Sequence, residues 1–394
     1  MNALKQITSI SAMNLRSVPQ RLGTSLVIVV GIAGVVAVML SVLAMATGVL
    51  QTIAETGRAD RAIVLRGGSA SELASAITRD QGLTILDAPG VKRDAAGEPI
   101  GSAETITLVD LPTQAGDSWA NVTVRGVGPK LFQLRPETKL VAGRPFKPAV
   151  HELIVGTKAM SQFPSLQLGK RIKINTDEWE VVGVFTSGGD RHESEIYGDA
   201  DTVMSAVRRN GYQPVTVLLE SPGSFEAFKT ALTTNPTLSV EVKRESEFFA
   251  EQSKPLARVL SIIAYVVGGI MAVGALFGAL NTMYSAVSAR GKEIATLRAL
   301  GFGATPVVIS VFVEAVALAL LGGALGCVAA WLFFDGNVIS TSGGGIAQLV
   351  FALTLTPGLI AVGVIWSFAI GLIGALFPAV RAARLPVATA LRAV

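Results

Sequence analysis

The sequence predicts a membrane protein with four transmembrane α-helices and a large α+β extracytoplasmic domain inserted between helices 1 and 2. Only 16% of the 394 residues are charged, whereas soluble domains carry about 25%. Four runs lack Asp, Glu, Lys and Arg, and each is long enough for the roughly 20 apolar residues that cross a bilayer: residues 22–54, 259–289, 315–334 and 336–380. Between the first two runs, residues 55–258 hold 24 Lys/Arg and 26 Asp/Glu. This distribution excludes a soluble enzyme, a disulfide-stabilised secreted domain and a disordered chain.

These runs set the expected order of segments along the chain. The order is an amphipathic cytoplasmic-side helix (1–21), transmembrane helix 1 (22–54), a periplasmic α+β domain (55–257), transmembrane helix 2 (258–289), a cytoplasmic helix (290–305), transmembrane helix 3 (306–334), an outer loop (335–351), transmembrane helix 4 (352–380) and a cytoplasmic tail (381–394).

Basic residues set the expected orientation in the membrane, because positive side chains in short loops stay on the cytoplasmic side. They gather in three short segments: Lys5, Arg16, Arg21, Arg290, Lys292, Arg298, Arg381, Arg384 and Arg392. Both termini and residues 290–298 are therefore expected in the cytoplasm, and residues 55–257 on the other side. This orientation accounts for the net charge of +4 without a nucleic-acid partner.

The first residues show apolar positions at helical spacing. Residues 3–18 therefore predict an interfacial amphipathic helix, with a frayed tail as the alternative. The apolar run that follows is longer than the hydrophobic part of a signal peptide, and three basic residues precede it. We interpret residues 22–54 as a retained transmembrane helix.

Residues 55–258 alternate short β-like runs with turn residues. The expected strands are residues 62–65, 122–125, 171–174, 179–185 and 215–219, and the expected helices are 71–78, 199–210 and 224–232. Strands mixed with helices indicate an α+β domain, which we expect to contain two subdomains.

The sequence shows no recognisable catalytic or metal site. His151 and His192 are too far apart for a zinc motif, and Cys327 is the only cysteine, so cysteine metal sites and disulfides within the chain are excluded. The sequence contains no phosphate-binding loop motif. We expect residues 190–195 to form a solvated polar loop, and a membrane-anchored enzyme that uses this loop is the alternative. The chain is expected to bind no cofactor of its own.

The segment between the second and third apolar runs carries the most informative pattern. Ile294, Leu297 and Leu300/Gly301 share one face of a short helix, and charged residues flank that face: Arg290, Lys292, Glu293 and Arg298. Gly301 is suited to ending this helix, and Pro306 to starting the next. Such a helix fits a groove on a cytosolic partner, or else lies against lipid headgroups. The residues alone leave both interpretations open.

Two further patterns concern the membrane helices. Glu314 lies at the start of the third apolar run, where a carboxylate is costly and often functional. It is expected either to form a hydrogen bond between helices that acts as a switch, or to reach toward the cytoplasmic interface. Gly274 and Gly278 form a G-x-x-x-G pattern in helix 2 and are a candidate packing face.

Several motifs resemble the MacB/FtsX-type ABC transporter permeases. They are Arg290-x-Lys292-Glu293-Ile294-x-x-Leu297-Arg298-Ala299-Leu300-Gly301, Phe312-Val313-Glu314-Ala315, Phe377-Pro378-Ala379 and Arg381-Ala382-Ala383-Arg384. In the inserted domain, Val124-Arg125-Gly126-Val127 and Gly143-Arg144-Pro145-Phe146 are similar to the periplasmic domain of that family. The sequence departs from the macrolide exporters of the family because it includes no ATPase domain.

The resemblance implies a non-catalytic, multi-pass permease subunit of the bacterial inner membrane that works as a homo- or heterodimer. The implied partners are a separate cytosolic ABC ATPase that uses ATP and Mg²⁺, a second permease subunit, membrane lipids and a periplasmic adaptor. The resemblance assigns the ATPase contact to a coupling helix: Arg290, Lys292, Glu293, Ile294, Leu297, Arg298, Leu300 and Gly301.

In such permeases, ATP-driven closing of the ATPases is passed to the periplasmic domain, which is called mechanotransmission. The implied function is export or extraction of an amphiphilic, peptide, antibiotic-like or lipid cargo. The alternative is a non-transporting division or signalling permease that regulates a periplasmic partner such as a cell-wall hydrolase.

Overall fold

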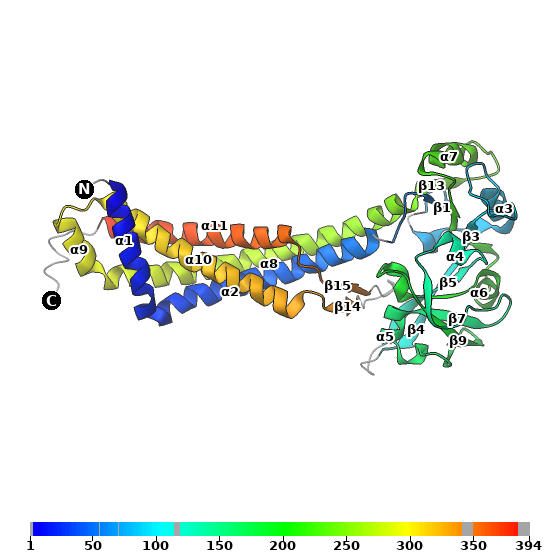
Figure 1. Cartoon of the computed structure of the whole chain (residues 1–394), viewed down its shortest axis with the longest axis horizontal. Helices are drawn as coiled ribbons and strands as arrows, with labels where there is room; N and C mark the ends of the chain where they lie inside the picture. The colour runs from blue at the N-terminus through cyan, green and yellow to red at the C-terminus, as the bar shows by residue number, and fades with distance from the viewer. Residues whose placement is uncertain (1–2, 55, 70, 114–118, 341–349, 385–394) are drawn as a thin grey trace. The chain divides into compact units, whose positions relative to one another are not determined.

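The structure is a computed structural model that describes residues 3–54, 56–69, 71–113, 119–340 and 350–384. It divides into two compact units (Figure 1). The helical unit comprises Met1–Thr47, Ala257–Asn337 and Leu353–Val394, and the inserted unit comprises Gly48–Leu256 and Val338–Ala352.

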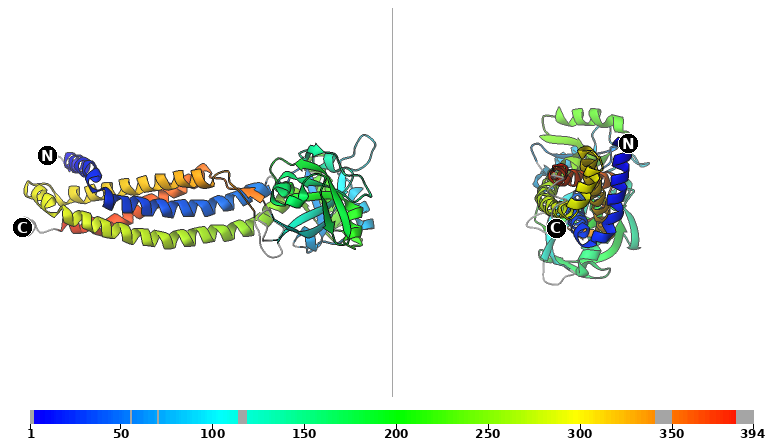
Figure 2. Two further views of the ribbon diagram at one scale, coloured as in Figure 1. Left: turned by 90° about the horizontal axis from the view of Figure 1, so that it is seen from below. Right: turned by 90° about the vertical axis from the view of Figure 1, so that its left-hand side faces the viewer.

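Among the described residues, four helices are long and apolar enough to cross a membrane. They are α2 (Leu22–Ala54), α8 (Glu245–Ala289), α10 (Ala304–Phe334) and α11 (Pro357–Ala383). Their apolar parts run side by side in the helical unit (Figures 1 and 2). The predicted set of four membrane helices is therefore confirmed.

Two shorter helices complete the helical unit. The predicted N-terminal helix is α1 (Ala3–Ser17), which the 3₁₀ turn η1 (Val18–Arg21) joins to α2. The predicted helix between the second and third spans is α9 (Gly291–Ala299). Both helices lie at the end of the helical unit that also contains the N-terminus (Figure 1).

Two membrane helices begin five or more residues away from their expected starts. Helix α8 begins at Glu245 rather than near residue 258, because its first turns carry charged residues that a hydropathy pattern does not register. Helix α11 begins at Pro357 rather than at residue 352: the Thr356 hydroxyl caps it, and β15 (Val350–Ala352) pairs with β14 (Val338–Ser340). Parts of the predicted outer loop (341–349) and tail (385–394) lie outside the described residues.

Helix α10 packs closely on α2 through two glycines four residues apart. A Cβ at Gly322 would lie 2.7 Å from the Val29 carbonyl oxygen, and one at Gly326 would lie 2.7 Å from the Ala33 carbonyl oxygen. Only glycine allows backbones to approach so closely. By contrast, a Cβ at Gly274 or Gly278 would meet open space. The predicted packing face of α8 is therefore not used between helices of this chain.

The inserted unit contains two main β-sheets. The four-stranded sheet has the order β13-β1-β12-β3, from Val240–Arg244, Arg61–Arg66, Val215–Leu218 and Gly101–Ala103. The seven-stranded sheet has the order β4-β5-β10-β7-β9-β6, with β8 paired to β9, from Thr105–Pro112, Trp119–Val127, Glu195–Asp199, Glu152–Gly156, Asp177–Thr186, Lys139–Gly143 and Arg171–Ile174. Strands β5 and β10 are parallel, as are β7 and β9, whereas the other pairs are antiparallel.

Each main sheet has its own hydrophobic core. The core of the four-stranded sheet includes Phe225 and Phe228 from α7 (Phe225–Thr233). The core of the seven-stranded sheet includes Trp179 and Phe163. Separate cores on separate sheets agree with the expected α+β domain of two parts.

The remaining elements of the inserted unit are short. They are η2 (Glu72–Ala74), β2 (Ile77–Thr78), α3 (Arg79–Leu86), α4 (Leu131–Leu134), α5 (Thr157–Gln162), η3 (Pro164–Leu166), η4 (Arg191–Ser194), α6 (Ala200–Ala206), β11 (Gly211–Tyr212) and η5 (Pro222–Ser224).

The structure confirms the five expected strands and two of the three expected helices, α6 and α7. The expected helix at residues 71–78 is wrong: this segment holds η2 and β2, and the helix that follows is α3. Its start is set by a capping box, in which Thr78 and Gln81 bond to each other's backbone amides.

Candidate functional site

Helix α9 is held between the ends of α8 and α10 by well-defined turns. Arg290 precedes its first residue, and its backbone N–H donates to the Ala286 carbonyl at the end of α8. At the other end, Gly301 adopts a φ of 92°, and the Phe302 N–H donates to the Leu297 carbonyl (3.1 Å). A glycine with positive φ after the last turn is a common helix terminator. These turns therefore make α9 a short helix that is separate from α8 and α10.

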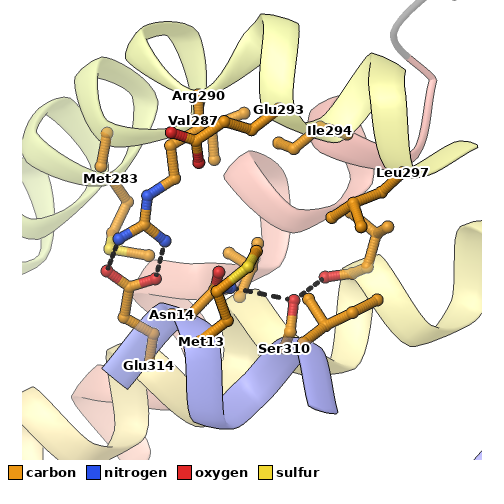
Figure 3. A pocket seen from close by; sticks show the side chains of 14 residues that line it. Met13, Asn14, Met283, Val287, Arg290, Glu293, Ile294, Leu297, Ser310 and Glu314 are labelled. Carbon is orange, nitrogen blue, oxygen red and sulfur yellow. Dashed lines mark hydrogen bonds and ion pairs between the residues drawn. The ribbon is translucent and has the colours of Figure 1, made fainter. Parts of the chain in front are cut away.

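A buried ion pair joins α9 to the third membrane helix (Figure 3). Arg290 Nη1 donates to Glu314 Oε2 (2.7 Å), and Arg290 Nη2 lies 3.3 Å from Oε1. Each residue is 5% exposed. Planar guanidinium and carboxylate groups bond in a fixed relative orientation. The pair therefore sets the direction in which the start of α9 meets α10.

Helix α1 adds two polar contacts to the same place. Arg290 Nη2 also donates to the Ser17 hydroxyl at the end of α1. One turn earlier, Asn14 Nδ2 donates to the Ser310 hydroxyl (3.1 Å), which in turn donates to the Val307 carbonyl (2.8 Å). Asn14 and Ser310 are buried. We call these five residues the polar clasp: Asn14, Ser17, Arg290, Ser310 and Glu314.

All members of the polar clasp except Ser17 line a cavity of about 20 Å³ (Figure 3). Glu293 and apolar side chains of α1, α8, α9 and α10 line the rest of it: Ile10, Met13, Met283, Ala286, Val287, Ile294, Leu297, Val307 and Val311. This volume accommodates about one water molecule. The clasp is therefore too closely packed to hold a cargo molecule, and its chemistry suits a mechanical connection between helices.

The structure shows which side of α9 packs against the other helices of the helical unit. Ile294 is buried, and Leu297 packs on the main core cluster of the helical unit. The exposed side instead carries Lys292, Glu293, Thr296 and Leu300, of which Leu300 is 73% exposed. The expectation that Ile294 and Leu297 face a partner therefore has to be corrected, because burial of an apolar row against the chain's own core takes precedence.

The other predicted residues divide between the two sides. Arg290 is buried in the clasp, so its guanidinium is not available on the surface. Arg298 is partly buried and donates to the Ala383 carbonyl at the end of α11 (2.9 Å). Gly301 is exposed. Glu314 bonds to Arg290 inside the structure, which supports the interhelical interaction rather than a side chain reaching for the interface.

A second buried charged region lies in the inserted unit. We call it the ionic network and define it by three arginines and four glutamates, each at most 3% exposed: Arg61, Arg125, Arg135, Glu72, Glu104, Glu195 and Glu245. Arg125 is its centre: it bonds to Glu104 (2.6 Å), Glu195 (2.7 Å) and Glu72 (2.9 Å). The sequence analysis did not identify this network.

The ionic network reaches into residues 190–195, which the sequence predicts as a solvated loop. That prediction is wrong: Asp190, His192 and Glu195 are each at most 2% exposed. The His192 Nδ1 lies 2.9 Å from Glu195 Oε2, and the His192 N–H donates to Asp190 Oδ1 (2.9 Å). The burying groups come from distant parts of the chain, which no local pattern reports. These contacts tie His192 to structural ion pairs.

Burial and neighbouring charge act in opposite directions on these carboxyls. Burial acts to raise the pKa of Glu195, yet Arg125 and His192 hold that pKa well below its usual value. No guanidinium of the described residues lies at bonding distance from Asp190, and burial raises its pKa above the ordinary value of 3.8. Glu195 is thus kept as a carboxylate, whereas burial shifts Asp190 toward its neutral form.

Two family models match the chain and together cover most of it. The MacB-like periplasmic core domain matches residues 22–235, and the FtsX-like permease C-terminal model matches residues 265–387. The first match alone covers more than half of the sequence. The chain belongs to the MacB/FtsX family of ABC transporter permeases. The family resemblance found in the sequence is thereby confirmed.

Relatives of this MacB/FtsX permease include both separate permeases and fused proteins. It is 28% identical over 226 residues to an uncharacterized ABC transporter permease of Methanocaldococcus jannaschii, covering 56% of each chain. It is 26% identical over 411 residues to the macrolide export ATP-binding/permease protein MacB of Shewanella sp. (strain ANA-3), covering 93% of this chain and 57% of that protein. The chain thus spans about half the length of the curated relatives it matches.

One solved structure is also similar to this permease. It is the extracellular domain of the noncanonic ABC-type transporter YknZ from Gram-positive bacteria, with 18% identity and a TM-score of 0.36, covering 46% of this chain and 99% of that one. Relatives that are separate permeases suggest a non-catalytic subunit, although the MacB relatives also carry an ATP-binding part by name.

Proposed function

We propose that the chain is the permease subunit of an ABC transporter that transmits the movement of a separate ATPase to the inserted unit. The observation that carries the proposal is the placement of α9. This helix follows α8 directly, and Arg290 ties it to α10 through Glu314 and to α1 through Ser17. A force on α9 therefore reaches both neighbouring membrane helices without passing through a flexible loop.

Helix α8 is suited to carry that movement away from α9. It has 45 residues, which corresponds to about 68 Å at 1.5 Å per residue. The hydrophobic core of a bilayer is only about 30 Å thick. Helix α8 is therefore longer than a span requires, and its first residues belong to the inserted unit. A helix of this length acts as a lever between α9 and the inserted unit.

The proposed orientation places α1, α9 and both termini in the cytoplasm of a bacterial inner membrane, with the inserted unit outside. Basic residues on the α9 side support it, since such residues remain cytoplasmic. The proposed partners are a cytosolic ABC ATPase that uses ATP and Mg²⁺ and a second permease subunit. The absence of a cargo-sized space at the clasp supports a mechanical role, with an amphiphilic cargo handled by the inserted unit and its own partners.

The exposed side of α9 is the proposed ATPase contact. Lys292, Glu293 and Leu300 lie there, and Leu300 is a large apolar residue with 73% of its surface exposed. Exposed apolar residues flanked by charge are typical anchors for a groove on a partner. Leu297 instead packs inward, so a charge at Leu297 would disturb the docking of α9 as well as any contact. A substitution at Leu300 therefore tests the ATPase contact without disturbing the packing of α9.

The test is copurification of the chain with a coexpressed cytosolic ABC ATPase. Leu300→Asp is expected to lower recovery of the ATPase at least tenfold. Leu83→Asp, at a 63% exposed leucine of the inserted unit, is the matched control and should leave recovery unchanged. Equal recovery with both variants would refute the assigned contact.

The orientation has its own test. A cysteine introduced at position 300 should react with a membrane-impermeant maleimide only after the membrane is opened, whereas one at position 83 should react in intact cells. Cys327 is buried and contributes little background. The reverse labelling pattern would place α9 on the outer side and end the proposal.

A further inference from the structure

Glu245 is the first residue of α8, and it is completely buried in the ionic network. Its Oε2 accepts from Arg61 Nε (2.5 Å), and its Oε1 accepts from Arg135 Nη1 (2.8 Å). The Arg58 backbone N–H donates to the same carboxylate (3.2 Å). A carboxylate at a helix N-terminus is also favoured by the helix dipole. The outer end of α8 is thus fixed by one side chain with three donors.

The outer end of α2 meets the same group of residues. Thr56, just beyond α2, is buried, and its hydroxyl accepts from the Arg191 N–H (3.0 Å). The Thr56 carbonyl accepts from Arg61 Nη2 (3.4 Å). At the next residue, a Cβ on Gly57 would lie 2.5 Å from the Ser246 Cα of α8. The segment that directly follows α2 is therefore in contact with the start of α8 and with the network.

From Glu245 the ion pairs continue without interruption to both main sheets. Arg61 belongs to β1 of the four-stranded sheet. In the other direction, Arg135 bonds to Glu104 (3.2 Å), and Glu104 bonds to Arg125 on β5. Arg125 then bonds to Glu195 on β10 of the seven-stranded sheet (2.7 Å). One connected set of charge-assisted bonds joins α8, β1, β5 and β10.

Stability alone does not explain so many buried charges. Removing charged groups from water carries a desolvation cost that their attraction only partly offsets, and apolar residues of similar size often stabilise as well or better. What arginine and carboxylate pairs add is fixed relative geometry, because their bonds are planar and directional. A displacement of the α8 end is therefore passed to the sheets instead of being absorbed by side-chain rearrangement.

We propose that Glu245 is the positioning residue through which the second membrane helix moves the inserted unit. The ionic network is the joint that makes the outer ends of α2 and α8 and the two main sheets respond together. This inference rests on the proposed mechanotransmission, because it identifies where a helix movement enters the inserted unit.

The first test is a double-mutant cycle on the full-length chain in lipid nanodiscs. Its members are the wild type, Glu245→Gln, Glu195→Gln and the double variant, compared by the melting temperature of the inserted unit. Among the described residues, Glu245 and Glu195 have no common hydrogen-bond partner. Residues that act independently give additive losses. A joint predicts that the double variant loses clearly less than the sum of the two single losses, and an additive result overturns it.

Hydrogen–deuterium exchange supplies a readout that a local structural role would not change. Glu245→Gln is expected to speed exchange in β10, which Glu245 does not touch. Glu251→Gln, on the same helix but in an exposed pair with Lys243 (2.8 Å), is the control and should leave β10 unchanged. Faster exchange confined to β1 and the first turn of α8 would overturn the proposal.

A variant that keeps the negative charge serves as the second test if the neutral variant does not fold. Should Glu245→Gln give no folded chain, Glu245→Asp replaces it in both measurements, because it keeps the charge but shortens the reach to the two arginines. The same pattern of non-additive losses and faster exchange in β10 is expected. Neither measurement needs the ATPase, so failure of the joint and failure of the ATPase contact at Leu300 give separate results.

Discussion

Two regions of this permease bury charge, and they do so in different ways. In the polar clasp one arginine meets one glutamate, and the remaining members are neutral. In the ionic network each arginine bonds to at least two carboxylates, although the second partner of Arg61 is the partly exposed Glu137 at the edge of the network. A single ion pair separates when one interaction breaks. In a shared network, breaking one bond leaves each side chain held by its other bonds.

This difference fits two mechanical tasks. An element that changes state needs alternatives separated by a few kcal/mol, which one ion pair beside a small cavity is able to supply. A joint needs one geometry that persists under load, and multiple bidentate contacts provide it. The clasp is therefore the better candidate for a switch, and the network is the better candidate for a rigid connection. Substitutions that remove charge distinguish these roles.

The largest effect is expected at the centre of the network. Arg125→Met leaves Glu72, Glu104 and Glu195 buried without their shared guanidinium. Removing one partner of a buried ion pair costs about 3–5 kcal/mol, and we expect at least this loss in the free energy of unfolding of the inserted unit. Denaturant unfolding of the full-length chain measures it.

The matched control is Arg171→Met, because Arg171 is exposed and its ion pairs are long, at 3.6 and 3.8 Å. It should change the free energy of unfolding by less than about 0.5 kcal/mol. Similar unfolding midpoints for the Arg125 and Arg171 variants would show that the network does not hold the two sheets together.

A smaller effect, and one that is reversible by a second substitution, is expected at the clasp. Arg290→Met or Glu314→Gln alone leaves the other residue buried without the opposite charge of the ion pair, and we expect each to cost about 3 kcal/mol. The double variant Arg290→Met/Glu314→Leu should recover most of that loss in stability, because an apolar pair of similar volume replaces the ion pair. Unfolding in nanodiscs measures the recovery.

The corresponding double variant of the network, Arg125→Met/Glu195→Leu, should not recover, because Glu72 still lacks the Arg125 guanidinium and Glu104 keeps only its longer bond to Arg135. ATP-driven activity of the complex adds a second comparison at the clasp. If the pair is a switch, the stable Arg290→Met/Glu314→Leu variant should bind the ATPase but lose coupled activity. Full coupled activity in that variant would show that the clasp only packs the helices together and is not a switch.

The sequence predicts the parts of this fold that depend on local composition. Charge-free runs locate the four membrane helices, and Gly301 and Pro306 mark the turn between α9 and α10. Helical periodicity also places Ile294 and Leu297 on one face, but periodicity does not say whether that face meets the chain itself or a partner. The packing glycines show the same limit: Gly274 and Gly278 fit the pattern, whereas Gly322 and Gly326 make the contact.

The ionic network could not be predicted from the sequence because its members are far apart along the chain. Arg125 pairs with Glu195 across 70 positions, and Arg61 pairs with Glu245 across 184. One local signal was present: Arg125 follows Val122 and Val124 in an apolar strand, where an unpaired charge is too costly to bury. An arginine in such a strand indicates a buried acidic partner without saying which one.

The smallest effect is expected at Asp190, which borders the network without a guanidinium at bonding distance among the described residues. Burial raises its pKa, so folding shifts this carboxyl toward its neutral form. The stability that this preference contributes is fully present below the ordinary pKa of 3.8 and is lost as the pH rises through the raised value. Asp190→Asn stays neutral at every pH and keeps the acceptor for the His192 N–H.

Asp190→Asn should therefore be more stable than the wild type at pH 7, by about 2–4 °C in melting temperature if the gain is about 1 kcal/mol. The difference should disappear as the pH falls below the ordinary pKa of the carboxyl. Glu72 and Glu195 have lowered pKa values and lose their stabilising charge on acidification, but that loss is common to both proteins and cancels in the difference. A variant less stable than the wild type at pH 7 would mean that Asp190 is a charged member of the network, and the network would then extend through η4 to Thr56 at the end of α2.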